Sequence, residues 1–423
     1  MSDTQLTGEH VTAGRLSVDI TILGAGMAGA SLVHLLAPAR KAGLSIALID
    51  RQPLNWDTAE ADRPPSFDGR ATALSWGTRQ ILDELNLWAG IEEYACAIEH
   101  IQVSDEGRFG QAQLHAHEQN CEALGYIIEN HRLGQGLLSG LLADDTRSSD
   151  LHLLAPCAAE RVRMNAGGAE LTLDDGRILQ TSLLIMADGG RSPLPAQLGI
   201  QQNRKDYEAQ ALVTQVRCDR VHEHWAYERF SSDGPIAFLP LGRNEYAVVW
   251  TLDTDEVSDA LSLDDATLIS RLQERIGHRV GAITEIGERL TYPLALVQST
   301  EQVRRSLVLL GNAAHSLHPV AGQGFNLTLR DAAVLAEHLN RAAQNGQNPG
   351  SLEVLEDYQK QQAADQRNTI AASDLLPRVF GSKIPAVAVL RDAGLLTMAA
   401  MPVARRMFAR HAMGLGHTAA RLG

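Results

Sequence analysis

The chain is short of three things: cysteine, basic charge and long apolar segments. Its four cysteines are scattered and form no C-x-x-C pair. This argues against disulfide cross-links and thiolate metal sites, and it fits a reducing cytoplasm. Acidic residues outnumber basic ones, 51 to 37, and the net charge of −14 argues against nucleic acid as a partner. At 423 residues, the chain is long enough for two or three packed units.

The two ends of the chain give no sign of an export signal or a membrane span. The N-terminus lacks a basic start followed by an apolar core, so we expect no signal peptide and a disordered tail over residues 1–16. The longest uncharged apolar-rich run near the C-terminus, residues 393–404, is far shorter than the roughly 20 residues that cross a bilayer. We therefore expect a cytoplasmic protein without a transmembrane helix.

The C-terminal segment differs from the rest of this acidic chain. Residues 375–423 contain seven basic residues and one acidic residue, together with several leucines, methionines and Phe408. One interpretation is contact with an anionic membrane surface or an acidic partner. The other is a helix pair that packs on its own domain and exposes a solvated arginine face. The sequence leaves both open.

A glycine-rich turn follows the first apolar segment, residues 18–23. Gly24 permits a tight turn, Gly26 lets the backbone approach a pyrophosphate, and Gly29 lets helix and strand pack closely. The N-terminus of the following helix would favour the anion. Asp50 ends the second strand, where a carboxylate would meet the ribose hydroxyls. We assign to this dinucleotide site Gly24, Gly26, Met27, Ala28, Gly29, Asp50 and Arg51.

Three further residues are weaker candidates for the same site. Asp188 follows a buried strand in an Asp-Gly turn, and its backbone or carboxylate could meet the cofactor. Arg70 follows the loop after the second strand and could reach the pyrophosphate or the ring. Asn130 precedes a predicted helix. The alternatives are a plain turn for Asp188 and a surface arginine for Arg70.

A second motif, residues 311–326, lies almost three hundred residues downstream. Gly322, Gln323 and Gly324 start a helix whose free N–H groups would stabilise the negative charge that a reduced flavin develops at N1–C2=O. Pro319 would make the approach rigid without offering an N–H. The catalytic candidates are therefore Pro319, Gly322, Gln323 and Gly324. The same four residues bind the cofactor in this interpretation, together with Asn312, Phe325 and Asn326.

Histidine pairs in the chain do not predict a metal site. The pairs His115-x-His117 and His222-x-His224 have strand spacing, but no further Cys, His or acid lies at a recognisable metal spacing. His315 and His318 lie near the second glycine motif. Each is either a catalytic base or a structural histidine with satisfied hydrogen bonds.

Periodicity along the chain predicts an α/β protein. We expect a Rossmann-type FAD-binding domain made of residues 17–200 and 300–345, interrupted by an inserted, mostly antiparallel β-sheet domain over residues 201–299. Strands near residues 97–128 could join the inserted sheet. Residues 346–423 are expected to form a helical C-terminal region.

These motifs, in this order, resemble the single-component FAD-dependent aromatic hydroxylases built like p-hydroxybenzoate hydroxylase. The likeness spans nearly the whole chain. Residues 311–319, 321–327 and 391–398 are similar to the ubiquinone-biosynthesis branch of that family. The chain departs from the wider family at Asn312, where Asp is usual. It also departs at Asn130, where the family has an Arg or Gln that reaches the flavin.

The resemblance implies a reaction. NAD(P)H reduces FAD and leaves, O₂ adds at flavin C4a, and the resulting hydroperoxide passes an OH to an electron-rich phenol such as 2-polyprenyl-6-methoxyphenol. A polyprenyl substrate lives in the membrane, which would give the basic, apolar tail a role in docking to the bilayer or to partner enzymes. The wall of the implied substrate pocket is assigned to Phe238, Leu239, Pro240, Leu241, Tyr227 and Trp250.

Three other functions stay open at this point. A sister hydroxylase could act at another ring position, because no residue here reports regiochemistry. An FAD-dependent reductase of prenyl lipids would never activate O₂. A non-catalytic scaffold could retain the fold without the flavin.

Overall fold

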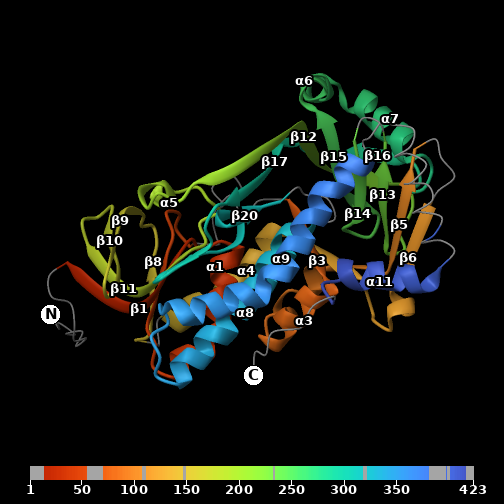
Figure 1. Cartoon of the computed structure of the whole chain (residues 1–423). Helices are drawn as coiled ribbons and strands as arrows, with labels where there is room; N and C mark the ends of the chain where they lie inside the picture. The colour runs from red at the N-terminus through yellow and green to blue at the C-terminus, as the bar shows by residue number, and fades with distance from the viewer. Residues whose placement is uncertain are drawn as a thin grey trace, which may run out of the picture.

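The computed structural model describes residues 14–54, 70–106, 111–145, 149–231, 234–317, 322–380, 397 and 401–415. Two large sheets lie at opposite ends of the molecule, and long helices cross the region between them (Figure 1). Pro319 and His318 lie outside the described residues.

The first sheet has eight strands and a parallel centre. Its order is β18-β19-β11-β1-β2-β8, and the strands from β19 to β8 run parallel to one another. The centre is apolar because helices and strands cover both faces; all four residues of β2 are buried, for example. The strands are β1 (Arg15–Leu23), β2 (Ile46–Ile49), β8 (Leu151–Leu154), β11 (Ile178–Met186), β18 (Val303–Arg304) and β19 (Leu307–Leu309), extended by the antiparallel β9 (Ala159–Asn165) and β10 (Gly168–Leu173).

Helices from distant parts of the sequence pack beside this sheet. A single buried core joins β1 and β2 to apolar residues of the helices. α8 packs against both α1 and α9, so a segment near residue 330 lies beside the first turn of the chain. The helices are α1 (Met27–Leu35), α2 (Ala37–Lys41), α4 (Asn130–Asp145), α8 (Gln323–Gln344) and α9 (Leu352–Phe380), with the short α5 (Leu194–Gln197) beside β9.

The second sheet has nine strands and is mostly antiparallel. Its order is β20-β17-β12-β15-β14-β13-β5-β6, with β16 paired to β12. The long strands β12 and β17 reach from this sheet back toward the first one (Figure 1). The strands are β5 (His100–Asp105), β6 (Gln111–His115), β12 (Gln202–Cys218), β13 (Trp225–Phe230), β14 (Ile236–Pro240), β15 (Glu245–Asp253), β16 (Ile283–Ile286), β17 (Leu290–Ser299) and β20 (His315–Ser316).

One face of the second sheet is covered by two amphipathic helices, α6 (Thr254–Ser262) and α7 (Asp265–Ile276). Leu268, Leu272 and Ile276 recur at helical spacing and pack against inward residues of β14 and β15. The N-terminus of α7 is capped by Asp264, which accepts a hydrogen bond from the Thr267 N–H. The opposite face of the sheet is therefore left to form one wall of a cavity.

A third sheet and a C-terminal helix complete the described structure. The three strands β3 (Ala71–Ser75), β7 (Gly125–Glu129) and β4 (Cys96–Ile98) lie between the two large sheets. α3 (Trp76–Glu84) follows β3, and α11 (Pro402–Ala412) packs near β5 and β6. Short 3₁₀ turns are η2 (Trp88–Gly90), η3 (Glu92–Tyr94), η4 (Ala116–Gln119) and η5 (Gly311–Ala313).

The α/β fold expected from the sequence is confirmed, and four details differ. The first strand begins at Arg15, inside the expected tail, because Arg15 pairs with Ile178. The sequence over residues 151–162 favours one continuous strand, whereas the structure has two strands separated around Pro156, which has no N–H to donate to a ladder. The sequence after the first glycine turn favours one helix over residues 26–42, whereas the structure has two, α1 and α2, which meet at Leu36, with Pro38 in the first turn of the second helix. The strand β13 was not predicted.

The segment near residues 97–128 is divided between two sheets. β5 and β6 join the second sheet, whereas β4 and β7 pair with β3 in the third. Within the described part of the chain, no helix combines the length and the apolar character that crossing a bilayer requires. The division of the chain into domains stays a prediction.

Candidate functional site

A cavity of about 1040 Å³ lies between the carboxyl ends of the parallel strands and the open face of the second sheet. Both glycine motifs line it. Gly24, Gly26, Met27 and Ala28 come from the first turn, and residues 322–326 come from the start of α8. Ligands in open α/β sheets bind at this end of the strands, where the loops gather. The cavity is therefore the candidate site.

The first turn is held by close backbone packing and by one carboxylate. Gly24 has a φ of +97°, and a Cβ on Gly29 would lie 1.9 Å from the carbonyl oxygen of Gly24. Asp50 accepts one hydrogen bond from the Ala25 N–H at 2.7 Å and another from the Gln52 N–H at 2.8 Å. Gly29 does not line the cavity; it allows the helix to pack closely against the turn. Arg51 does line it.

Asp188 offers a hydrogen-bond acceptor that fits a ligand in the cavity. Its Oδ1 accepts a hydrogen bond from the Gly190 N–H at 3.0 Å. Its Oδ2 is buried and has no hydrogen-bond partner among the described residues. Burying a carboxylate oxygen without a partner is costly, and Asp188 lines the cavity. A hydroxyl-bearing ligand in the cavity would supply the missing donor.

The start of α8 is shaped for close approach by a ligand. Gly322 caps the helix with a φ of +59°, and a Cβ there would lie 2.7 Å from the Cβ of Ala73. A Cβ on Gly324 would meet no atom within 4 Å, because it would extend into open space at the cavity lining. The first N–H groups of any helix lack partners within it. Gln323, which also lines the cavity, donates a hydrogen bond to the Ala412 carbonyl of α11 at 3.2 Å.

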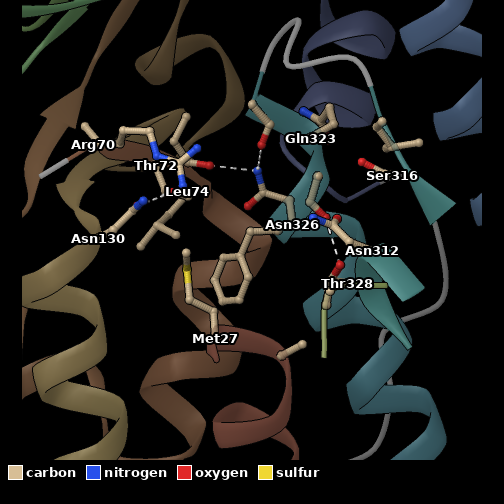
Figure 2. Close-up of a pocket in the computed structure, with 18 of the residues that line it drawn as sticks. Met27, Arg70, Thr72, Leu74, Asn130, Asn312, Ser316, Gln323, Asn326 and Thr328 are labelled. Carbon is tan, nitrogen blue, oxygen red and sulfur yellow. Dashed lines mark hydrogen bonds between the residues drawn. The ribbon is translucent and has the colours of Figure 1, made fainter. Parts of the chain in front are cut away.

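Asn326 is a clamp rather than a free ligand. Its Oδ1 accepts hydrogen bonds from the Ser75 N–H at 2.8 Å and the Thr78 hydroxyl at 2.7 Å. Its Nδ2 donates to the carbonyls of Ala73 at 2.8 Å and Gly322 at 2.7 Å. Figure 2 shows this side chain between β3 and the start of α8. All four contacts are within the protein, so Asn326 positions the second glycine turn instead of offering its amide to the cofactor.

Arg70, Asn130 and Asn312 surround the cavity from other sides, as Figure 2 shows. The guanidinium carbon of Arg70 lies 4.4 Å from the centre of the Tyr292 ring, a cation–π contact that joins the third sheet to the second. The Arg70 carbonyl accepts a hydrogen bond from the Asn130 N–H at 2.7 Å. Asn130 Oδ1 accepts one from the Thr72 hydroxyl at 2.6 Å. Phe325 also lines the cavity.

The expected wall of the second sheet is corrected in part. Leu239 lines the cavity, but Phe238 and Trp250 are buried in the core against α6 and α7. Tyr227 borders the cavity, but it pairs across the sheet with Phe238 and its side chain packs against that same core. Side chains of a strand alternate between faces, so neighbours cannot all face one cavity. Pro240 and Leu241 are likewise absent from the lining; Leu241 packs beside Ile98 and Ile127. Residues missed by the sequence reasoning include Ala237, Val249, Ala226, Glu228 and Tyr292.

Neither described histidine group supplies a base to the cavity. His315 Nε2 lies 2.9 Å from Asp331 Oδ2, both side chains are buried, and Asp331 Oδ1 accepts a hydrogen bond from Gln362. His315 is therefore a structural histidine.

His222 and His224 form a cluster with Cys96, which lies far away in the sequence. One potential metal-ligating atom of each residue lies within 4.8 Å of the other two.

Hydrogen bonds to the protein already occupy this Cys96–His222–His224 cluster. The two ring nitrogens of His222 bond the Gly242 carbonyl and the His224 N–H. Burial raises the pKa of the Cys96 thiol to about 11, which keeps the sulfur protonated near neutral pH. The cluster is therefore satisfied without an ion.

The residues present fit an FAD molecule. The cavity joins a turn that can hold a pyrophosphate to a helix start that can lie against a flavin ring. The unpartnered Asp188 oxygen and the open space beside Gly324 lie in the same lining. A site volume of about 1040 Å³ lies slightly above the roughly 300–1,000 Å³ range of ligand pockets, which suits a large cofactor.

Comparison with known proteins gives the family. A family model described as an FAD binding domain matches residues 17–373. The chain is 35% identical over 411 residues to the ubiquinone hydroxylase UbiL of Rhodospirillum rubrum, covering 96% of this chain and 92% of that protein. It is 28% identical over 398 residues to the 3-demethoxyubiquinol 3-hydroxylase of Escherichia coli, covering 94% of this chain and 98% of that protein.

Solved structures show the same fold. PqsL of Pseudomonas aeruginosa, a probable FAD-dependent monooxygenase, aligns with a TM-score of 0.72 at 21% identity, covering 90% of this chain and 99% of that one. The p-nitrophenol 4-monooxygenase PnpA of Pseudomonas putida aligns with a TM-score of 0.71 at 16% identity, covering 95% and 99%. The chain therefore belongs to the FAD binding domain family, alongside hydroxylases of ubiquinone biosynthesis, and is an FAD-dependent monooxygenase that uses NAD(P)H and O₂.

Proposed function

We propose that this protein hydroxylates a polyprenylated phenol, 2-polyprenyl-6-methoxyphenol, in ubiquinone biosynthesis. The observation that carries the proposal is one cavity with two unlike halves. One half has glycine turns and polar groups suited to FAD, and the other is an apolar wall of the second sheet. An aromatic ring with a prenyl chain matches that wall. The names of the relatives support the pathway.

Each part of the lining has its own task in this proposal. The turn at Gly24 and Gly26 would hold the pyrophosphate, and Asp188 would accept a hydrogen bond from a cofactor hydroxyl. The N–H groups at the start of α8 would lie at the ring edge and stabilise negative charge there. FAD itself would supply the transfer of electrons from NAD(P)H and the activation of O₂. The protein holds the partners and keeps water away from them.

The apolar wall of the second sheet keeps water out of the cavity. Val213, Ala237, Leu239 and Val249 come from neighbouring strands of the second sheet and line the cavity together. Tyr292 adds an aromatic face that is fixed by Arg70. Such a surface favours a phenol and its apolar substituent over water.

The substrate is tested by mass spectrometry of quinone intermediates in cells that lack the protein. We expect 2-polyprenyl-6-methoxyphenol to accumulate and to disappear when the gene is restored. Turnover under ¹⁸O₂ should place one labelled oxygen in the product. Accumulation of a later, already hydroxylated intermediate would instead indicate the sister reaction at another ring position, for which the name of the Escherichia coli relative is the supporting observation.

We further propose that α11 lies on an anionic membrane surface. One side of the helix is fixed to the protein: Arg405 forms two hydrogen bonds with Glu118, at 2.7 and 2.9 Å, and Ala409 and Met413 are buried. The other side is exposed and apolar, with Val403 at 66% and Met407 at 68% exposure. Arg406 and Arg410 beside them are exposed as well.

The packed side of α11 adjoins the cavity, which Ala409, Ala412 and Met413 line. Phe408, which is 38% exposed, lines the cavity as well. A prenyl chain could therefore pass from the lipid along α11 to the wall of the second sheet. Apolar side chains flanked by arginines are the usual composition of an interfacial helix.

The membrane proposal predicts the effect of a charge at position 407. We expect Met407→Glu to lower binding to vesicles of phosphatidylcholine with phosphatidylglycerol at least about tenfold. Inserting a Met side chain from water into the bilayer contributes about 1.5–3 kcal/mol, and the glutamate loses this contribution. Leu261→Glu, on the exposed surface of α6, is the matched control and should bind like wild type. Equal cosedimentation of Met407→Glu and wild type would remove α11 from the contact.

A further inference from the structure

Glu228 is the one charged residue that the second sheet contributes to the described lining of the cavity. It lies on β13, where Ala226, Glu228 and Phe230 share the cavity face by strand alternation. Its direct neighbours across the sheet are Val103 on β5 and Ala237 on β14, and both also line the cavity. A carboxylate thus lies in a wall that is mostly apolar and otherwise uncharged.

The described structure gives this carboxylate no partner. Among the described residues, the Glu228 carboxylate makes no hydrogen bond and no ion pair. Burial raises its pKa from 4.5 to about 7, and no neighbouring charge contributes to the shift. A glutamate kept without a partner in an apolar wall is an expensive feature for a fold, and such groups gather at functional sites.

The charges around Glu228 lie elsewhere. On its own strand, the next residue, Arg229, approaches Glu106 at 3.8 Å, and Glu106 also pairs with Arg275 of α7 at 3.0 Å. On β5, the buried Asp105 lies two residues beyond Val103; β14 carries no titratable side chain. The remaining charged residues of the lining belong to the opposite half of the cavity: Asp50, Arg51, Arg70, Asp188 and Arg191.

We propose that the Glu228 carboxylate accepts the hydroxyl proton of the phenol substrate. This inference rests on the proposed function and adds a catalytic residue to it. The phenol O–H bond breaks, and the proton moves to a Glu228 carboxylate oxygen. The electron pair of the broken O–H bond stays on the phenol oxygen. No electrons are exchanged in this step, and the total charge is unchanged. The resulting phenolate has a more electron-rich ring, and the proton returns to the product oxygen after oxygen transfer.

The position of the carboxylate makes this transfer feasible. An ordinary glutamate has a pKa of 4.5 and the phenol has a pKa of about 10, so proton transfer between them would be unfavourable by about five to six orders of magnitude. The pKa of about 7 at Glu228 reduces this gap to about three orders of magnitude. An amide at the same place could still accept a hydrogen bond, but it could not take the proton.

The test compares Glu228→Gln with Glu274→Gln. The second variant makes the same chemical change on the exposed surface of α7 and serves as the control. The purified, FAD-loaded proteins are assayed with 2-geranyl-6-methoxyphenol, NAD(P)H and O₂. We expect kcat for hydroxylation to fall at least about 100-fold in Glu228→Gln, the usual scale for losing a general base. In wild type and Glu274→Gln, kcat/KM should rise with pH through about 7; in Glu228→Gln that rise should be absent.

Stability gives a readout that does not depend on turnover. Because the folded-state pKa of Glu228 lies above its ordinary 4.5, its contribution is fully present below pH 4.5 and is lost as pH rises to about 7. The Tm of wild type should therefore fall relative to that of Glu228→Gln between these two pH values. Glu274→Gln should track wild type throughout.

The outcomes separate the two proposals. If wild type hydroxylates the phenol and Glu228→Gln does so equally fast with the same pH profile, the role of Glu228 is overturned and the proposed function stands. If wild type hydroxylates no prenylated phenol at all, the proposed function itself falls. A lost pH dependence in Glu228→Gln, with FAD still bound, supports Glu228 as the base.

Discussion

Replacing Gly26 by valine should remove FAD from a protein that still folds. Gly26 precedes α1 with φ −65° and ψ −175°, a conformation that valine also adopts, so the backbone needs no rearrangement. Gly26 lines the cavity, and a branched side chain there would occupy the space of the pyrophosphate. We expect affinity for FAD to fall at least about 100-fold, equal to about 2.8 kcal/mol.

The measurement is flavin absorbance of the purified variant together with its circular dichroism. Gly90→Val is the matched control, because Gly90 lies in η2 with no atom within 4 Å of an added Cβ. It should bind FAD like wild type. A folded Gly26→Val protein with its full complement of flavin would show that the pyrophosphate lies elsewhere.

Replacing Asn326 by leucine should destabilise the fold and weaken FAD binding together. Leucine has a similar size, but it leaves the Ser75 N–H and the carbonyls of Ala73 and Gly322 without their partners. Each buried polar group left unsatisfied costs about 1–3 kcal/mol, so we expect a loss of roughly 3 kcal/mol or more. FAD affinity should fall as well, because this amide holds Gly322 against Ala73.

Urea unfolding of the FAD-free proteins measures this effect. Asn326→Asp should lie between wild type and leucine, since a carboxylate keeps the acceptor for Ser75 and Thr78 but loses both donors. Asn345→Leu, at the exposed C-terminal end of α8, is the control and should cost little. An Asn326→Leu midpoint equal to that of wild type would mean that the clamp contributes nothing to the fold.

The parts of the site that the sequence predicts well are those with a local cause. The first glycine turn requires small residues because its own backbone closes on itself, as the contact of Gly29 with Gly24 demonstrates. A short apolar strand before the turn and a helix after it add constraints over about 20 residues. The start of α8 follows the same logic, since Gly322 adopts a positive φ at a helix cap.

The parts that the sequence did not predict depend on partners far away in the chain. Asn326 looked like a cofactor ligand, but its hydrogen-bond partner Ser75 lies 251 residues earlier. The wall was misassigned because the sequence gives the alternation of β14 without saying which face points to the cavity. Phe238, which is larger and more apolar than Ala237, is buried in the core, and the smaller Ala237 lines the cavity.

At α11 the C-terminal segment packs on its own protein, as one of its two sequence interpretations expects, and its contact with a membrane stays a proposal. α11 packs one side on the protein through Ala409 and Met413, and it exposes Met407 and Val403 on the other. Composition alone could not separate these sides. Contacts with distant residues, such as that of Arg405 with Glu118, decide which side of this short helix faces the protein.

The most direct test of the account is an experimental structure of the protein with FAD bound. We expect the pyrophosphate against the backbone of Gly24 and Gly26, a cofactor hydroxyl on Asp188, and the flavin ring edge beside Gly322 and Gly324. Density for the ring far from the start of α8, or for the pyrophosphate away from the turn after β1, would contradict the claim that both glycine turns hold one cofactor.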